Sequence, residues 1–282
     1  MKCFILTRFN LSLWPADKKG KSTRTGQWLQ QRFELFERFC FPSVQHQTVQ
    51  DFEWIILFDS ETPAIYRDKI KEYKQTLPAF TPYFVPAKSG PYFAYIFQSI
   101  VSSKVAVGDK VVTTYLDNDD ALRFDYIETV KRLAAGAGDS PTFISFKYGL
   151  QYFTSLNIAL SISFPTNHFI SLAEVYSKEG SIKTVFGYGS HMGIEGYRGA
   201  RVLYVDDREK AGWIEVVHES NVVNEVRLTW EKRLVRDIHK LQEEYGIAIA
   251  LSRHSMWIFC TGFVLRMLEQ GYRRLQWRIF GK

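Results

Sequence analysis

Three aspartates fall within four consecutive positions of the sequence, in the stretch TYLDNDDALR at residues 114–123. They follow the apolar run DKVVTTYL, which predicts a buried strand, so repulsion and desolvation call for a compensating positive charge. Residues two apart in an extended chain face the same side, so Asp117 and Asp119 can point at one cation. Carboxylate oxygens suit Mg²⁺ or Mn²⁺, which bind one or two carboxylates together with substrate phosphates. We therefore favour a metal site.

The alternative is that Asp119 or Asp120 caps the next helix, which needs only one aspartate.

The elements that position these aspartates alternate between strand and helix patterns over about the first 135 residues. Apolar runs at KCFILTRF, FEWIILFD and KVVTTYL predict strands, and the segments between them follow the helical period. This order predicts a mostly parallel sheet flanked by helices, with ligands bound beyond the carboxyl ends of the strands. Arg8, Asp59 and Asp117 stand at three such ends, so we expect them to converge on one crevice.

The pattern changes after this half of the chain. Residues 141–219 read as short strands and turns, and the sequence after 225 becomes helical again. We therefore expect an α/β domain over residues 1–224 and a C-terminal helical extension over 225–282.

Composition limits the classes of function. The chain has 282 residues, 46% of them hydrophobic, and a net charge of +6. Residues 221–282 carry eleven Lys and Arg against six Asp and Glu, which leaves the first 220 residues nearly neutral and disfavours nucleic-acid binding by the main domain. Three widely spaced cysteines and an N-terminus without a signal-peptide pattern predict a cytoplasmic protein.

Longer motifs carry a resemblance. The block RFELFERFCFPSVQHQTVQDFEWIILFDSETP, then YLDNDDAL, then WIEVVHESNV is similar to the family of bacterial rhamnosyl transferases. A strand that ends in Asp-x-Asp also resembles the metal–nucleotide motif of glycosyltransferases with the Rossmann-like GT-A fold. The three blocks lie within about residues 8–225.

The resemblance implies a role for each acidic strand end. Asp59 would accept a hydrogen bond from the base of a donor nucleotide, Asp117 would contact its ribose, and Asp119 would bind the metal that neutralises the departing diphosphate. Arg8 would contact the base or a phosphate, and the alternative for Arg8 is a plain surface ion pair.

A histidine completes the expected metal site. His218, within the WIEVVHESNV block, is the preferred further ligand of Mn²⁺ or Mg²⁺, and His191 is its competitor. An inverting transfer needs a carboxylate that deprotonates the acceptor hydroxyl. Glu174 is our candidate and Glu195 the alternative, and a retaining mechanism stays open.

The sequence thus predicts a metal-dependent glycosyltransferase that uses a nucleoside-diphosphate sugar, with dTDP-L-rhamnose as the donor that the resemblance suggests. The acceptor would be a glycan or a lipid-linked glycan. Two rival functions are a metal-dependent nucleotide-sugar hydrolase and a non-catalytic module that binds nucleotides or glycans. Residues 252–282 mix large apolar side chains with five Arg and one Lys, which suits either a peripheral membrane contact or a core or dimer helix.

Overall fold

The structure is a computed structural model that describes residues 1–13, 16, 20, 22–177, 182–218 and 233–262. Its first sheet has seven strands in the order β10-β6-β9-β4-β1-β2-β3. β9 runs antiparallel to its neighbours β4 and β6, and the other pairings in this sheet are parallel. The strands are β1 (Lys2–Arg8), β2 (Glu53–Asp59), β3 (Phe80–Val85), β4 (Lys110–Tyr115), β6 (Thr142–Phe146), β9 (Ile170–Val175) and β10 (Arg201–Val205).

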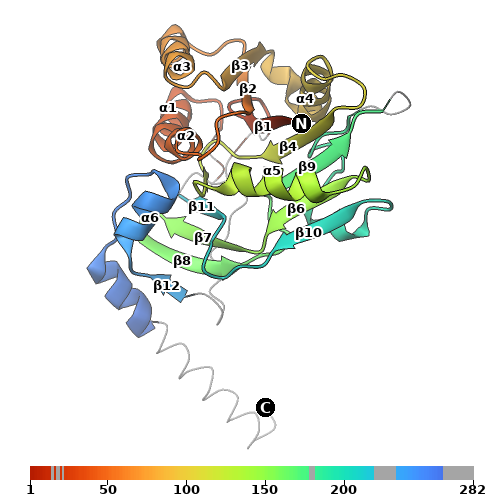
Figure 1. The fold of residues 1–282 in the computed structure, drawn as a ribbon. Coiled ribbons are helices and arrows are strands. Elements are labelled where there is room, and N and C mark those ends of the chain that lie inside the picture. The colour runs from red at the N-terminus through yellow and green to blue at the C-terminus, as the bar shows by residue number, and fades with distance from the viewer. Residues whose placement is uncertain (14–15, 17–19, 21, 178–181, 219–232, 263–282) are drawn as a thin grey trace, which may run out of the picture.

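Helices cover both faces of this sheet (Figure 1). The side chains of α1, α2, α3 and α5 pack on one face, where Ile5, Trp54 and Val112 lie, and α4 packs on the other, where Phe4 and Val111 lie. Both faces are therefore apolar, which explains why β2 reads as a nearly continuous hydrophobic run. The helices are α1 (Gly26–Leu35), α2 (Phe41–Gln45), α3 (Ala64–Thr76), α4 (Phe93–Ser102) and α5 (Tyr126–Gly136), with a π-helical turn η1 (Phe36–Cys40) between the first two and short 3₁₀ turns η2 (Ala87–Tyr92) and η3 (His191–Gly196).

A second sheet of five strands has the order β12-β8-β7-β11-β5. Its inner side chains pack with α6, as Leu150, Tyr152 and Val216 lie in one cluster with Leu241 and Tyr245. Figure 1 places this sheet and α6 on the opposite side of the molecule from α3 and β3. The elements are β5 (Ala121–Leu122), β7 (Tyr148–Phe153), β8 (Ile158–Ser163), β11 (Trp213–Val217), β12 (Arg233–Val235) and α6 (Ile238–Tyr245).

The aspartate stretch joins the two sheets. β4 ends at Tyr115 in the first sheet, and β5 begins at Ala121 in the second, so residues 116–120 form the connection. The architecture confirms the predicted fold class, a mixed and mostly parallel α/β sheet flanked by helices. The parallel order β4-β1-β2 places the carboxyl ends of the three expected strands next to one another.

The described part of the C-terminal region contains a strand as well as helices. Residues 233–235 form a strand that pairs with β8, and α6 with the segment after it contributes Leu241, Tyr245 and Ile249 to the core. The expected boundary at 224/225 lies outside the described residues.

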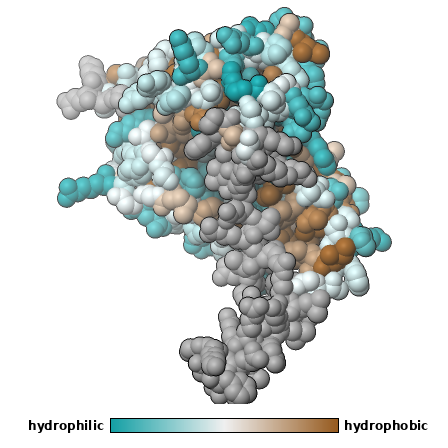
Figure 2. Space-filling view, turned by 180° about the vertical axis from the view of Figure 1, so that it is seen from behind, coloured by the Kyte–Doolittle hydropathy of each residue, from teal (hydrophilic) through white to brown (hydrophobic). Residues whose placement is uncertain are grey.

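Residues 253–262 are helical, and Met256 and Phe259 pack on a small cluster around Phe153. Trp257 and Ile258 stay exposed, and the view from behind shows apolar surface at several separate places (Figure 2). In the part of the chain that the structure describes, no helix combines the length and the apolar character that a membrane crossing requires. Residues 263–282, most of the expected membrane-contact segment, lie outside that part.

Candidate functional site

The ends of β4, β1 and β2 are tied together by two asparagine side chains. Nδ2 of Asn118, from the β4–β5 connection, donates to the carbonyl of Phe9 at 2.8 Å. Oδ1 of Asn10 accepts from the backbone N–H of Asp59 at 2.9 Å. Because these bonds bridge neighbouring strand ends, they hold Arg8, Asp59 and Asp117 at one edge of the sheet. Arg8 pairs with Asp117, whereas Asp59 lines a pocket that neither of them lines.

Arg8 holds Asp117 from within an aromatic cage. Its Nη2 donates to Oη of Tyr115 at 2.5 Å and lies 3.4 Å from Oδ1 of Asp117. Tyr115 in turn donates to Oδ2 of Asp117 at 2.6 Å. The guanidinium carbon lies 4.5 Å from the ring centroid of Phe93 and 5.6 Å from that of Phe186. Arg8 is thus a half-buried group that orients Asp117, which differs from the surface ion pair considered as its alternative.

Asp119 binds two partners through one oxygen. Oδ2 lies 2.6 Å from Nη1 of Arg32 on α1 and 2.8 Å from Nε2 of His218, which follows β11. Burial alone would raise the pKa of Asp119, but Arg32 and then His218 hold it well below its usual range. No described residue donates a hydrogen bond to Oδ1. The structure therefore brings together the predicted pair, Asp119 and His218, from positions 99 residues apart.

Asp120 lies in a different environment. Its Oδ2 lies 3.1 Å from Nε2 of His168, and its Oδ1 accepts from the backbone N–H of Val216 at 2.8 Å. Burial and then the charge of Asp119 raise the pKa of Asp120 to about 8. Burial would lower the pKa of His168, but the hydrogen bond to Asp120 and its charge outweigh that effect and raise it to about 9.

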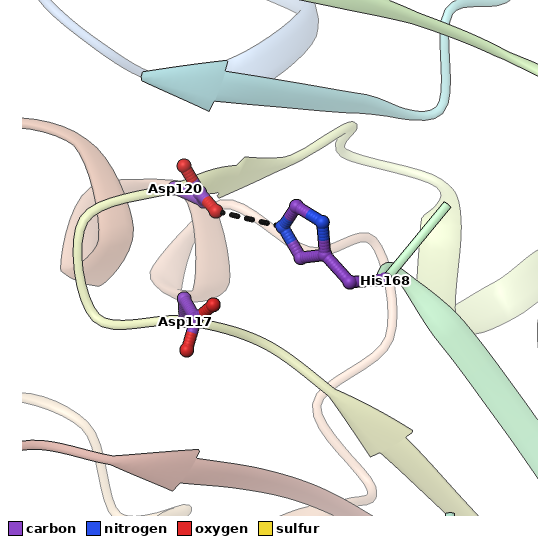
Figure 3. Close-up of side chains that lie close together, drawn as sticks. All are labelled: Asp117, Asp120 and His168. Atoms are coloured by element: carbon purple, nitrogen blue, oxygen red, sulfur yellow. Dashed lines mark hydrogen bonds and ion pairs between the residues drawn. The ribbon is translucent and has the colours of Figure 1, made fainter. Parts of the chain in front are cut away.

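Asp117, Asp120 and His168 form a compact group (Figure 3). One ligand atom from each lies within 4.8 Å of the others, and the imidazole of His168 points at the turn that carries both carboxylates. His191 contacts this group only indirectly. Its Nδ1 lies 2.6 Å from the carbonyl of Thr166, and its ring centroid lies 6.0 Å from that of His168.

Asp59 lines a pocket with a volume of about 190 Å³ at the start of α1. Its Oδ2 lies 2.9 Å from Nη2 of Arg24, and its Oδ1 accepts from the backbone N–H of Glu61 at 2.9 Å. The expected base-binding carboxylate is thus placed at a cavity, a short distance along the same strand edge from the aspartate turn.

The structure does not bring Glu174 to this site. β9 is antiparallel to β4, and Glu174 pairs with Val111, six positions before Asp117, or roughly 20 Å along the strand. Both of its carboxylate oxygens accept backbone N–H groups, from Lys183 at 3.1 Å and Thr184 at 2.8 Å. Burial raises the pKa of this carboxyl. These contacts indicate a residue that anchors the segment after β9, and they differ from those expected of a catalytic base.

Glu195 is no better placed. It is exposed and accepts a hydrogen bond from the hydroxyl of Tyr204. Neither candidate for the catalytic base contacts the aspartate turn.

Sequence reasoning missed two residues of the site. Arg32 lies on the apolar stripe of α1 between Leu29 and Phe36. A charged side chain on a buried helix face needs a partner of opposite charge, so the sequence could have predicted that Arg32 pairs with a buried carboxylate. His168 offered no such signal, because its place depends on the antiparallel direction of β9, which no local pattern reveals.

The family described as "Putative rhamnosyl transferase" matches residues 12–229. The chain belongs to this family. Membership confirms the resemblance carried by the three sequence blocks. Asp59, Asp117, Asp119 and His218 lie within the matched residues, and Arg8 precedes them.

Similar solved structures include TarS of S. aureus, with a TM-score of 0.44 and 11% identity over 77% of this chain and 37% of that one. They also include TarS 1-349 and its complex with UDP, each with a TM-score of 0.43, 12% identity and coverage of 77% of this chain. The matches span 60% and 61% of those two chains. The chain thus corresponds to less than two thirds of each, and this similarity carries no argument about its ligands. Among curated proteins, none matches the chain.

Proposed function

We propose that this protein is a glycosyltransferase that transfers a sugar from a nucleoside-diphosphate donor to a hydroxyl acceptor, with a divalent cation bound at the aspartate turn. The observation that carries the proposal is the 2.8 Å approach of His218 Nε2 to Asp119 Oδ2, beside Asp117 and within one row of strand ends. L-rhamnose is the sugar that the family description suggests.

The residues present fit a divalent cation. Asp119 and His218 supply a carboxylate and an imidazole, which suit Mn²⁺ and, through the oxygen ligand, Mg²⁺. Arg32 and His218 both contact Oδ2 of Asp119, and no described residue donates to Oδ1, so Oδ1 is the oxygen offered to the cation. Asp117, Asp120 and His168 form the neighbouring set of candidate ligands. When bound, the cation would neutralise the negative charge of the diphosphate leaving group.

The remaining donor contacts are assigned to the strand ends. Asp59 accepts an N–H of the donor base from its pocket, and Asp117 accepts a ribose hydroxyl. Arg8 and Tyr115 fix the orientation of the Asp117 carboxylate before the donor arrives. Arg32 places a fixed positive charge beside Asp119, where the diphosphate would lie.

The acceptor is proposed only from the chemistry of sugar transfer, which needs a hydroxyl group. It is a glycan or lipid-linked glycan hydroxyl, and residues 252–282 would approach an anionic membrane surface if the acceptor is lipid-linked. In the described portion of that segment, Trp257 and Ile258 are exposed.

Thermal shifts with a panel of sugar nucleotides, each with and without Mn²⁺, test the donor class. Stabilisation of the protein by binding to the folded state is expected for a cognate donor. Product analysis then separates the proposal from its rivals. Sugar transfer to an added acceptor supports it, plain hydrolysis favours a nucleotide-sugar hydrolase, and binding without turnover favours a non-catalytic module.

A further inference from the structure

The pocket beside Asp59 is lined on one side by an arginine that pairs with the carboxylate. It lies between the start of α1 and the segment that follows β2, and its walls include Asn10, Trp28 and Thr62. Arg24 also lines it, and its Nη2 lies 2.9 Å from Oδ2 of Asp59. A second contact, from Nη1 of Arg24 to the carbonyl of Asn10 at 3.4 Å, keeps the guanidinium at the pocket.

The hydrogen bonds of Asp59 differ between its two oxygens, and Oδ2 is the one that faces Arg24. Oδ1 is held by the backbone N–H of Glu61 at 2.9 Å, within the tight turn after β2. Oδ2 has Arg24 as its partner. The Asp59 side chain is only 6% exposed, so a ligand reaches Oδ2 through the pocket and meets the guanidinium there.

Arg24 can leave this position easily. Its side chain is 40% exposed, and it precedes α1 in an irregular segment of the chain. A partly exposed ion pair of this kind is weak, because water and salt compete with it. The guanidinium therefore holds the closed arrangement with a modest preference over an open one.

We propose that Arg24 is a competitive gate of the nucleobase pocket. It occupies Oδ2 of Asp59 until a base with an imide N–H, such as uracil or thymine, takes its place. The Asp59 side chain is only 6% exposed, so the guanidinium and the imide must reach Oδ2 from the same pocket side and compete for that space. The inference rests on the proposed function, since it takes Asp59 as the contact of the donor base.

The test measures binding of uridine, which carries the base without a phosphate that Arg24 could contact. NMR titrations would compare the wild-type protein with Arg24→Gln and with the control Arg198→Gln, which removes another exposed arginine. Removal of a weak competitor raises apparent affinity by the inverse of the open fraction, so we expect uridine to bind Arg24→Gln about threefold more tightly. Arg198→Gln should match the wild type.

Two further titrations, with cytidine and with added NaCl, test the same competition. Cytidine lacks the imide N–H and offers only its 4-amino group, so it should bind both proteins more weakly than uridine does. Added NaCl screens the ion pair and should tighten uridine binding to the wild type while leaving Arg24→Gln unchanged.

Equal or weaker uridine binding by Arg24→Gln overturns the gate, because it means that Arg24 is neutral or is itself a base contact. Asp59→Asn separates this failure from that of the donor assignment. If Asp59→Asn binds uridine as the wild type does, Asp59 is not the base contact, and both proposals fail. If it loses uridine while Arg24→Gln shows no gain, only the gate is wrong.

Discussion

Neighbouring carboxylates differ sharply in this molecule. Asp119 is balanced by Arg32 and His218, and its pKa lies well below the usual range, whereas Asp120 has a pKa raised to about 8 by burial and by Asp119. Asp117 is partly exposed and is oriented by Arg8 and Tyr115. The sequence predicted that these charges need compensation. It could not show which positive group pairs with which aspartate, because Arg32 lies 87 residues from Asp119 and His168 lies 48 residues from Asp120.

Two histidine variants test which imidazole binds the cation. His218→Ala should weaken nucleoside-diphosphate binding in the presence of Mn²⁺ by about tenfold, because a ligand is lost. His191→Ala should change it less than about twofold, since His191 contacts the carbonyl of Thr166 and none of the aspartates in the β4–β5 connection. Calorimetric titration measures both affinities. If His191→Ala weakens binding more than His218→Ala does, our choice of His218 as the metal ligand is wrong. A large loss in His168→Ala alone would assign the cation to Asp117, Asp120 and His168.

Glu174→Gln tests our initial assignment of the catalytic base. The structure predicts that sugar transfer persists, because Glu174 lies near the start of β4. It also predicts a loss of about 1–3 kcal/mol of unfolding free energy, because a buried carboxylate that accepts two backbone N–H groups loses one acceptor. Activity and urea denaturation are measured together. A variant that folds normally and has no transfer activity would restore Glu174 as the base.

At the scale of elements, the site is built where two sheets meet. The strand ends of β4, β1 and β2 supply Asp117, Arg8 and Asp59, and their common sheet edge followed from the β-α-β pattern. The second sheet supplies His218 through β11, and its position depends on the pairing of β11 with the two-residue strand β5. A strand of two residues shows no hydrophobic periodicity. The position of His218 relative to the aspartates therefore could not be predicted from the sequence.

Gly149→Ala tests the link between the second sheet and the site. A Cβ at Gly149 would lie 2.2 Å from the Trp213 ring, and that ring stacks on Phe169 at 4.7 Å, next to His168. Overpacking of this kind costs about 1–3 kcal/mol and displaces the indole, so both stability and activity should fall. Gly136→Ala, at the end of α5, is the matched control because its Cβ would meet nothing within 4 Å. Equal stabilities of the two variants in urea would contradict the packing described here.

At the scale of the molecule, the C-terminal region belongs to the core as far as residue 249. Leu241, Tyr245, Ile247 and Ile249 are buried, and Arg123 lies 3.3 Å from Glu244 of α6. The helical period after 225 correctly indicated α6. It gave no sign that β12 would join a sheet, because that pairing lies 72 residues away along the chain.

Two truncations test this division of the chain. Burial of four large apolar side chains is worth roughly 6–12 kcal/mol, which is comparable to the whole stability of a domain, so a chain that ends at residue 232 should fail to fold. A chain that ends at residue 251 should unfold cooperatively and lose any salt-sensitive binding to anionic vesicles, since it lacks the basic apolar segment. Circular dichroism and vesicle co-sedimentation measure these outcomes. A folded chain 1–232 would show that the extension is separable after all.

The central claim is that a divalent cation couples the aspartate turn to a nucleoside diphosphate. Calorimetric titration of the wild-type protein with UDP and with dTDP, in Mn²⁺ and in EDTA, tests it most directly. The account predicts at least about tenfold stronger binding of one of them with Mn²⁺, a coupling of about 1.4 kcal/mol. That gain should disappear when Asp119 is replaced by Asn. Equal affinities in Mn²⁺ and EDTA, or a gain that survives Asp119→Asn, would contradict it.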